Sequence, residues 1–271
     1  MESNISNFSS EREKKVLLRM EGINKSFPGV KALDDVSLTV KAGTVHALMG
    51  ENGAGKSTLM KCLFGVYTKD SGHIYLEDRE VNFKNSKEAL ENGVAMVHQE
   101  LQPIPERSIG ENIYVGRYPT KKYGPVTVID HDKMYEDAAK VLKEVHLNYD
   151  PHAKLGTLSV SQMQLVEIAK AVSADCKVLI LDEPANFVDN KFEKELYAIL
   201  RQLNDRMAII MVSHDLGTIT SHVKSIVCVN RHVHRHNSNV ITPEQLHNYD
   251  CPIQIVSHGT VPHTVLEEHA D

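Results

Sequence analysis

The segment GENGAGKS, residues 50–57, decides the fold that we predict for this chain. It fits the pattern G-x-x-x-x-G-K-[S/T], in which a glycine-rich turn lets backbone N–H groups and the positive end of the following helix converge on phosphate oxygens. The strand-like TVHALM precedes it and the helix-like KSTLMKCLFG begins within it, as the pattern requires. A chance match has odds of roughly one in a hundred in a chain of this length. We therefore predict a site for a nucleoside triphosphate.

The loop and the first helical turn supply the candidate phosphate ligands. Lys56 is expected to reach the β and γ phosphates, and Ser57 to bind Mg²⁺ through its hydroxyl. The full set of candidate ligands in this segment is Gly50, Asn52, Gly53, Ala54, Gly55, Lys56, Ser57 and Thr58.

Two further strand ends carry candidate catalytic residues. In KVLILDEP an apolar strand ends in Asp182 and Glu183, and His214 directly follows the apolar strand MAIIMVS. Because successive strand residues point to opposite sides, we assign Asp182 to Mg²⁺, directly or through water, and Glu183 to polarising the attacking water. His214 is placed to hydrogen-bond the γ phosphate. Taken alone, Asp-Glu is also an ordinary helix-start signal and a single histidine at a strand end is more often structural.

The composition allows a globular protein and argues against nucleic-acid binding and against a chain that spans a membrane by itself. The chain has 271 residues, of which 41% are hydrophobic, enough for a sizeable core. A net charge of −6 without a Lys/Arg stripe argues against nucleic acid. No apolar run approaches the roughly 20 residues that cross a bilayer. Residues 1–15 are polar and are interpreted as a flexible tail of a cytoplasmic protein.

The hydrophobic patterns predict an α/β fold. VLLRM and VSLTV, between residues 16 and 40, alternate like strands of a partly exposed antiparallel sheet. The uninterrupted apolar strands KVLILD and MAIIMVS flank a helical stripe, which indicates a mainly parallel sheet covered on both faces. Residues 87–174 are predicted to be mainly helical. The segment 226–271 is rich in histidine and is predicted to contain short strands and turns.

The order of the motifs resembles a known family. The phosphate loop, Gln99 in VHQE, LSVSQ at residues 158–162, LILDEP, Asp189 and SHD follow one another as in the nucleotide-binding domain of ABC transporters. The chain from residue 16 to 271 is similar to one such domain. The resemblance implies a P-loop ABC ATPase with an N-terminal antiparallel β subdomain, an inserted helical subdomain, and ATP and Mg²⁺ as cofactors.

The signature LSVSQ has a particular meaning in that family. There it begins a helix and contacts the γ phosphate of the ATP that the opposite domain holds. The resemblance therefore implies that Ser159, Ser161 and Gln162 serve the ATP of a second copy, in a head-to-tail homodimer with composite sites. Ser159 and Gln162 also fit the capping box S-x-x-Q, so an ordinary capped helix is the alternative. Val160 and Ser161 replace the two glycines of the usual LSGGQ.

Other positions take their roles from the resemblance alone. Phe27 stands where the family places an aromatic ring against adenine. Gln99 corresponds to the contact with Mg²⁺, with water and with the membrane subunit. Asp189 corresponds to the aspartate of the interdomain loop, although NFVD departs from the common S-x-L-D.

The resemblance implies the motor subunit of an importer, bound to a permease at the inner face of the cell membrane. Residues 16–185 resemble monosaccharide importers of the galactoside type, and residues 186–269 resemble zinc or manganese importers. We interpret the chain as an engineered or natural chimera joined near LILDEPA. The alternatives are a hybrid scaffold that binds nucleotide without transport, and a relative that acts on DNA. His232, His234 and His236 alternate, which predicts either a metal site or a polar strand face.

Overall fold

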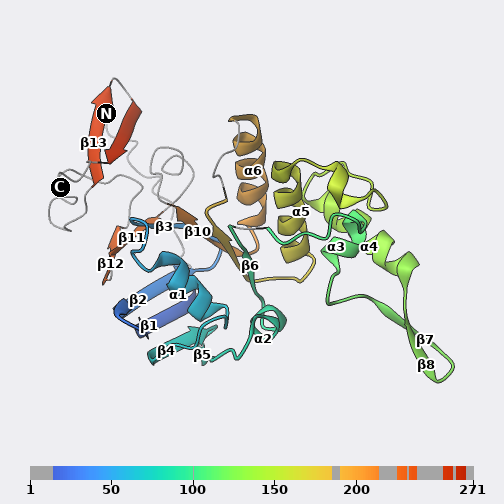
Figure 1. Ribbon diagram of the computed structural model, residues 1–271, viewed down its shortest axis with the longest axis horizontal. Coiled ribbons are helices and arrows are strands. Elements are labelled where there is room, and N and C mark those ends of the chain that lie inside the picture. The colour runs from blue at the N-terminus through green and yellow to red at the C-terminus, as the bar shows by residue number, and fades with distance from the viewer. Residues whose placement is uncertain are drawn as a thin grey trace, which may run out of the picture.

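The computed structural model describes residues 15–99, 101–184, 190–213, 225–230, 232–236, 253–258 and 261–266. Its centre is a six-stranded sheet with the order β12-β11-β3-β10-β9-β6 (Figure 1). These strands are β3 (Val45–Met49), β6 (Val94–Val97), β9 (Val178–Asp182), β10 (Ala208–Ser213), β11 (Ser225–Asn230) and β12 (His232–His236). Strands β11, β3, β10, β9 and β6 run parallel, and β12 pairs antiparallel with β11.

An antiparallel sheet with the order β2-β1-β4-β5 packs beside the central sheet. Its strands are β1 (Val16–Phe27), β2 (Val30–Lys41), β4 (Ser71–Leu76) and β5 (Arg79–Glu80). Leu18, Met20 and Ile23 of β1 are fully buried, whereas most residues between them are partly exposed. The sheet predicted from the N-terminal alternation is therefore confirmed.

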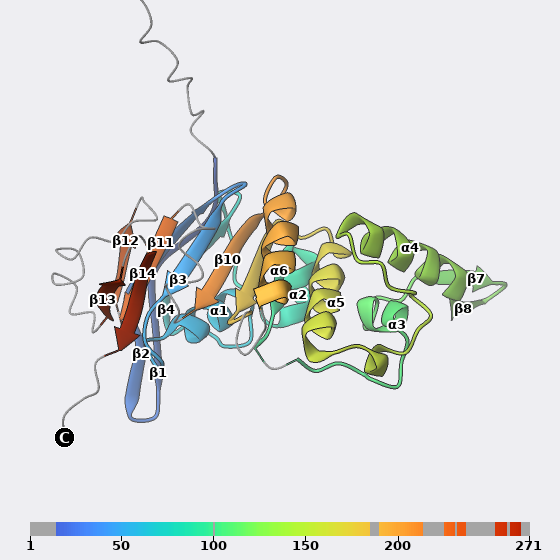
Figure 2. The ribbon, with the colours of Figure 1, turned by 90° about the horizontal axis from the view of Figure 1, so that it is seen from above.

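The helices lie on both sides of the central sheet, and α3, α4 and α5 gather at one end of the molecule (Figure 2). The helices are α1 (Lys56–Leu63), α2 (Ser86–Glu91), α3 (Ile109–Ile113), α4 (His131–Glu144), α5 (Val160–Val172), α6 (Asn190–Leu203) and the short 3₁₀ turn η1 (Leu155–Thr157). Among the described residues, none of these helices has the length and hydropathy needed to cross a membrane.

The central sheet is buried on both faces because its strands are apolar without interruption. Every residue of β3 and β9 is buried, and successive residues enter different clusters. Leu179 and Leu181 of β9 pack with α5 and α6, whereas Val178 and Ile180 pack with α1 and the antiparallel sheet. The mainly parallel sheet covered on both faces is thus confirmed.

One part of the fold differs from the sequence prediction. Residues 87–174, predicted to be mainly helical, also contain strand β6 of the central sheet and the hairpin of β7 (Thr120–Tyr123) and β8 (Val126–Ile129). The four-residue run of β6 is too short for its periodicity to separate strand from helix. Strands β4 and β5 are separated by a two-residue turn at Glu77 and Asp78, whose φ values are +52° and +63°.

The histidine-rich segment contains short strands, as predicted. Besides β11 and β12, the hairpin of β13 (Ile253–His258) and β14 (Val261–Leu266) falls in it. His232, His234 and His236 occupy alternate positions of β12, but their side chains lie outside the described part of the structure. The described residues contain no cluster of three or more metal-ligating side chains.

Candidate functional site

The carboxyl ends of the parallel strands meet at one edge of the central sheet. Val212 of β10 pairs with Leu48 of β3 on one side and with Asp182 of β9 on the other, and β6 pairs with β9. The phosphate loop follows β3, Gln99 follows β6 and Glu183 follows β9. Segments far apart in the sequence are thereby brought to the edge at which open α/β sheets bind their ligands.

The end of the phosphate loop depends on Gly55. Its φ is +98°, and a Cβ atom added to it would lie 2.5 Å from the carbonyl oxygen of Ala32. Gly53 has a φ of +84°, but no described atom lies within 4 Å of its Cβ position, so its requirement is conformational only. Helix α1 begins at the next residue, Lys56, and no described side chain caps it. Its first N–H groups are therefore available to an anion.

Lys56 lies inside the loop. Its buried ammonium donates hydrogen bonds to the carbonyl oxygens of Gly50 at 2.7 Å and Glu51 at 2.8 Å. Burial lowers the pKa of Lys56, and the carboxylates of Glu183, Asp182 and Glu51 partly oppose that shift. An ammonium has three N–H groups, so these two bonds leave one for a phosphate oxygen.

Ser57 and Asp182 join the loop to the end of β9. The Ser57 hydroxyl donates a hydrogen bond of 3.0 Å to Asp182 Oδ1, across 125 residues of sequence. Asp182 is only 4% exposed, and burial raises the pKa of its carboxyl, opposed by the bond from Ser57. The two residues predicted to bind Mg²⁺ are thus in direct contact.

Glu183 has an unusual backbone. Its φ is +50°, in the left-handed region that a residue other than glycine rarely adopts, and its N–H donates to the Val212 carbonyl at 3.0 Å. Its carboxylate Oε2 accepts a hydrogen bond of 3.2 Å from Gln99 Nε2. The predicted water-polarising acid and the glutamine predicted to contact water therefore meet at the sheet edge.

The signature segment begins helix α5 with the predicted capping box. Ser159 Oγ accepts from the Gln162 N–H at 3.3 Å, and Gln162 Oε1 accepts from the Ser159 N–H at 2.9 Å. Ser159 is exposed, Ser161 is partly exposed, and the Val160 side chain is 74% exposed beside them. Among the described contacts none joins this segment to the phosphate loop of the same chain.

The remaining predicted ligands are not brought together in the same way. Phe27 is 37% exposed near the turn between β1 and β2 and packs edge-on against Tyr67, with ring centroids 5.2 Å apart. Within the loop, Asn52 is exposed and Ala54 is buried, and Thr58 is partly exposed on the first turn of α1. Asp189 and His214 lie outside the described residues.

The structure also contains a groove that the motifs did not predict. A hollow of about 430 Å³ lies between α2, β6 and α5, and its lining includes Leu90, His98, Arg117, Glu167 and Lys170. Neighbouring residues partly desolvate the exposed His98 and so lower its pKa, opposed by the charge of Asp182. Arg117 donates to the Ser173 hydroxyl at 2.8 Å and to the Lys170 carbonyl at 3.2 Å. No local sequence pattern identifies Arg117 as a residue of this groove. For His98, its position next to Gln99 is the one sequence feature that could have pointed to the groove.

The family model "ABC transporter" matches residues 33–186, more than half of the 271 residues. The chain belongs to the ABC transporter family. Among solved structures, the ATP-binding cassette MJ1267 of an ABC transporter, in its ADP conformation, has a TM-score of 0.74 at 27% identity and covers 86% of this chain and 94% of its own. A dimeric structure of the ABC transporter cassette MJ0796 has a TM-score of 0.69 at 22% identity, covers 83% of this chain and 100% of its own, and supports the fold alone.

Similar ABC transporter proteins include galactose/methyl galactoside import ATP-binding proteins. The protein MglA of Clostridium tetani (strain Massachusetts / E88) is 53% identical over 208 residues, which are 76% of this chain and 41% of that protein. MglA of Salmonella typhimurium (strain LT2) is 53% identical over 204 residues, 75% of this chain and 40% of that protein. The chain therefore spans about two fifths of the length of the curated relatives it matches.

These matches do not support the chimera interpretation. A match of 208 residues cannot fit into the 185 residues that precede the predicted junction, so the likeness to the galactoside type continues beyond it. Neither the resemblance of residues 186–269 to zinc or manganese importers nor the hybrid scaffold derived from it finds support in these comparisons. The shared motif LILDEP, which made a junction plausible, is explained equally well by one continuous ABC transporter domain.

Proposed function

We propose that this chain binds and hydrolyses ATP as the motor domain of an ABC-type importer. The observation that carries the proposal is the 3.0 Å hydrogen bond between Ser57 and Asp182. It joins the phosphate loop to the acidic end of β9, so that a triphosphate and its metal ion would lie at one place. Membership of the ABC transporter family supports the same activity.

The residues at this place fit Mg²⁺. The Ser57 hydroxyl, the Asp182 carboxylate and the amide oxygen of Gln99 are hard oxygen ligands of the kind that Mg²⁺ prefers. When bound, Mg²⁺ would neutralise charge on the β and γ phosphates. Because a bound cation favours the carboxylate form, it would also offset the effect of burial on Asp182.

The other residues would act on the nucleotide and the water. Lys56 would bind the β and γ phosphates, together with the N–H groups of the loop and of α1. Glu183 would accept a proton from the attacking water, and Gln99, already hydrogen-bonded to Glu183, would hold that water in place. His214 would bind the γ phosphate, and Phe27 would pack against adenine. The backbone of Asn52, Gly53, Ala54 and Gly55, and Thr58 beside Ser57, would complete the phosphate site.

A second copy would complete each site. Ser159 and Ser161 lie at the exposed start of α5, where free backbone N–H groups favour an anion, and they make no described contact with their own phosphate loop. We propose a head-to-tail homodimer in which Ser159, Ser161 and Gln162 contact the ATP held by the partner, with Asp189 at the interface. Other ABC transporter cassettes form dimers.

We further propose a membrane partner. Motor domains of importers act with permease subunits, and the groove between α2, β6 and α5 is next to Gln99 and has both apolar and charged lining residues. A permease segment in this groove would place the domain at the inner face of the membrane. The names of the similar proteins support a galactoside-type sugar as cargo.

We assign residues 16–271 to a single domain with a helical subdomain at about 87–174.

The dimer is tested with Glu183→Gln, which should bind ATP without consuming it. In size-exclusion chromatography the variant should elute as a dimer with ATP·Mg²⁺ and as a monomer without nucleotide. The double variant Lys56→Ala, Glu183→Gln should remain monomeric in both conditions, because it lacks a phosphate ligand. A monomer of Glu183→Gln at saturating ATP·Mg²⁺ would contradict the composite site.

A further inference from the structure

Backbone hydrogen bonds join two segments of the chain, one that follows Gln99 and one that precedes the signature at Ser159. Residues 105–110, which follow the Gln99 loop, run antiparallel to residues 151–156, which precede the signature at Ser159. We call these paired segments the ladder. Its bonds run from Gly156 N to Pro105 O at 3.0 Å and, each at 2.9 Å, from Leu155 N to Arg107 O, Ile109 N to Ala153 O and Gly110 N to Pro151 O.

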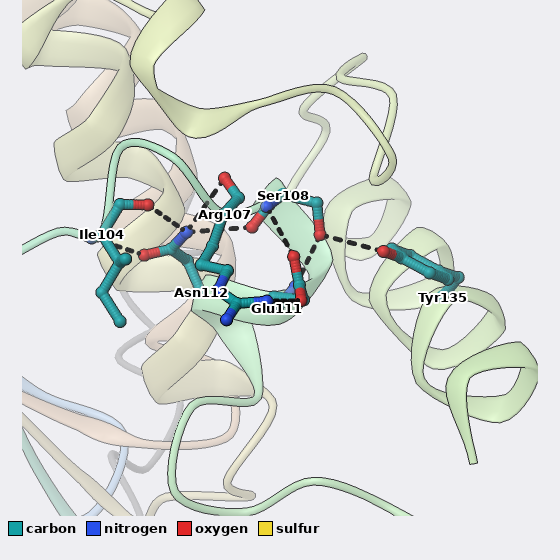
Figure 3. A network of polar contacts seen from close by, with 6 residues as sticks. All are labelled: Ile104, Arg107, Ser108, Glu111, Asn112 and Tyr135. Atoms are coloured by element: carbon teal, nitrogen blue, oxygen red, sulfur yellow. Dashed lines mark hydrogen bonds and ion pairs between the residues drawn. The ribbon is translucent and has the colours of Figure 1, made fainter. Parts of the chain in front are cut away.

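The side chain of Asn112 in helix α3 hydrogen-bonds the backbone at and next to the first segment of the ladder, residues 105–110 (Figure 3). Its side chain accepts from the Ile104 N–H at 2.9 Å, and its amide group donates to the carbonyl oxygens of Ile104 at 3.0 Å and Ser108 at 2.9 Å. Asn112 is 3% exposed, so these bonds are largely shielded from water. One buried side chain thus links the backbone at Ile104 to the backbone at Ser108.

Helix α4 holds the second strand of the ladder in place. The Tyr135 hydroxyl and Ser108 Oγ form a hydrogen bond (Figure 3), with the two oxygens 3.2 Å apart, and the Tyr135 ring stacks on His152 with centroids 3.8 Å apart. A Cβ atom added to Gly110 would lie 2.8 Å from the Tyr135 ring, so helix α3 packs here without spare room. The ladder, the start of α3 and Tyr135 therefore form one rigid unit.

We propose that Asn112 is a positioning residue that makes Gln99 and Ser159 move together. Ile104, which it holds, is five positions beyond Gln99, and Gly156, on the other strand of the ladder, is three positions before Ser159. This inference rests on the proposed function, in which Gln99 serves the ATP of its own subunit and Ser159 serves the partner's ATP. The rigid unit then couples the two composite sites of the dimer.

Asn112→Asp tests the proposal because it keeps the shape of the side chain and its acceptor oxygen, but removes the donated bonds. Three quantities are measured at a temperature at which the variant is folded: turnover, the Kd for ADP, which lacks the γ phosphate that Ser159 would contact, and amide hydrogen exchange at Leu155 and Gly156. We expect turnover to fall by roughly 10- to 100-fold, since a misplacement of about 1 Å costs that much. The Kd should stay within about twofold because the phosphate loop is untouched, and exchange should accelerate.

Asn92→Asp is the matched control, since its amide donates to the Glu88 carbonyl four positions earlier at 2.8 Å, away from the ladder. It should leave turnover and exchange at parent values. If Asn112→Asp does not fold, Gly156→Ala decides: its Cβ would press on Pro105 at 3.2 Å and should cause a smaller loss in the same direction.

Two results would overturn the proposal: a folded Asn112→Asp, or failing that Gly156→Ala, with parent turnover, or a loss of ADP affinity as large as the loss of turnover. If the parent itself does not hydrolyse ATP, the proposed function fails, and the exchange of Leu155 and Gly156 alone decides whether Asn112 fastens the ladder.

Discussion

At the scale of single residues, two left-handed backbone positions of the candidate site, besides that of Gly53, are fixed by their neighbours. Gly55 occupies one at the end of the phosphate loop, where the carbonyl of Ala32 excludes any side chain. Glu183 occupies the other, with a φ of +50°, at a cost of about 1–3 kcal/mol for a residue of its kind. Glycine is needed at position 55 because the backbone packs closely there. The left-handed conformation of Glu183 turns the chain after β9, where the carboxylate of Glu183 meets Gln99.

The role of Glu183 predicts the effect of its amide variant. Glu183→Gln should slow steady-state ATP hydrolysis by about 10²–10⁴-fold, because a positioned general base contributes that much. Binding of ATP should persist, since Lys56 and the loop are unchanged. Phosphate release measures the rate and equilibrium binding measures the affinity. Glu80→Gln, at an exposed glutamate of β5, is the control and should keep the parent rate. Parent turnover in Glu183→Gln would exclude Glu183 as the base.

At the scale of elements, helices α3 and α5 both begin with a capping box. Ser108 and Glu111 form a capping box at the start of α3, and Ser159 and Gln162 form one at the start of α5. In α3 the acid of the box is charged and lies beside Arg107. In α5 the corresponding residue is neutral, which leaves the positive end of that helix open to an outside anion. The two helix starts are thus alike in geometry and differ in charge.

The charged box predicts a pH dependence of stability. Hydrogen bonds from the Ser108 N–H and hydroxyl, with Arg107 nearby, hold the pKa of Glu111 below its ordinary value of about 4.3. A carboxyl group with a lowered folded-state pKa stabilises the fold above its unfolded-state pKa, and this contribution is lost as the pH falls through the folded-state pKa. The free energy of unfolding of the parent should therefore exceed that of Glu111→Gln at neutral pH. The difference should shrink below about pH 4.

Urea unfolding of the parent and Glu111→Gln between neutral pH and about pH 3 measures this difference. Glutamine keeps the neutral form of the box, so the variant isolates the charge. A difference that stays constant over the whole range would show that the carboxylate contributes nothing through its ionisation.

At the scale of the whole molecule, the central sheet separates two cores. Leu181 packs with α5 and α6 on one face, and Ile180 packs with the antiparallel sheet and α1 on the other. Because both faces are buried, the site at the carboxyl edge of this sheet is held from both sides. The helices of the far end, with the exposed β7–β8 hairpin, extend away from it (Figure 2).

The two cores predict that neighbouring residues of one strand are equally sensitive. Leu181→Ala and Ile180→Ala should each lower the free energy of unfolding by about 2–5 kcal/mol in urea titrations, because each leaves a cavity in a close-packed core. Val126→Ala, at a side chain 57% exposed on β8, should change it by less than about 0.5 kcal/mol. If one of the two core variants matched Val126→Ala, one face of the sheet would not be covered as described.

Most elements could be predicted from local patterns, and the failures have a common cause. The apolar runs of β9 and β10, the stripe of α6 and the capping box of α5 each contain their own evidence within a few residues. Strand β6 was missed because a run of four apolar residues is compatible with either helix or strand. The chimera was inferred from likeness in short stretches, which cannot replace a continuous match of 208 residues.

The sequence by itself determined the phosphate loop, the acidic end of β9, the fold class and the order of the motifs, because each is encoded by neighbouring residues. Only the tertiary structure decided which of them touch. Ser57 meets Asp182 across 125 residues, and Gln99 meets Glu183 across 84 residues. These contacts, like the hydrogen bonds of Asn112 with Ile104 and Ser108, depend on strand register and helix packing. Contacts between residues so far apart in the sequence form only when the parallel strands align in one sheet, and no local pattern in the chain specifies these contacts.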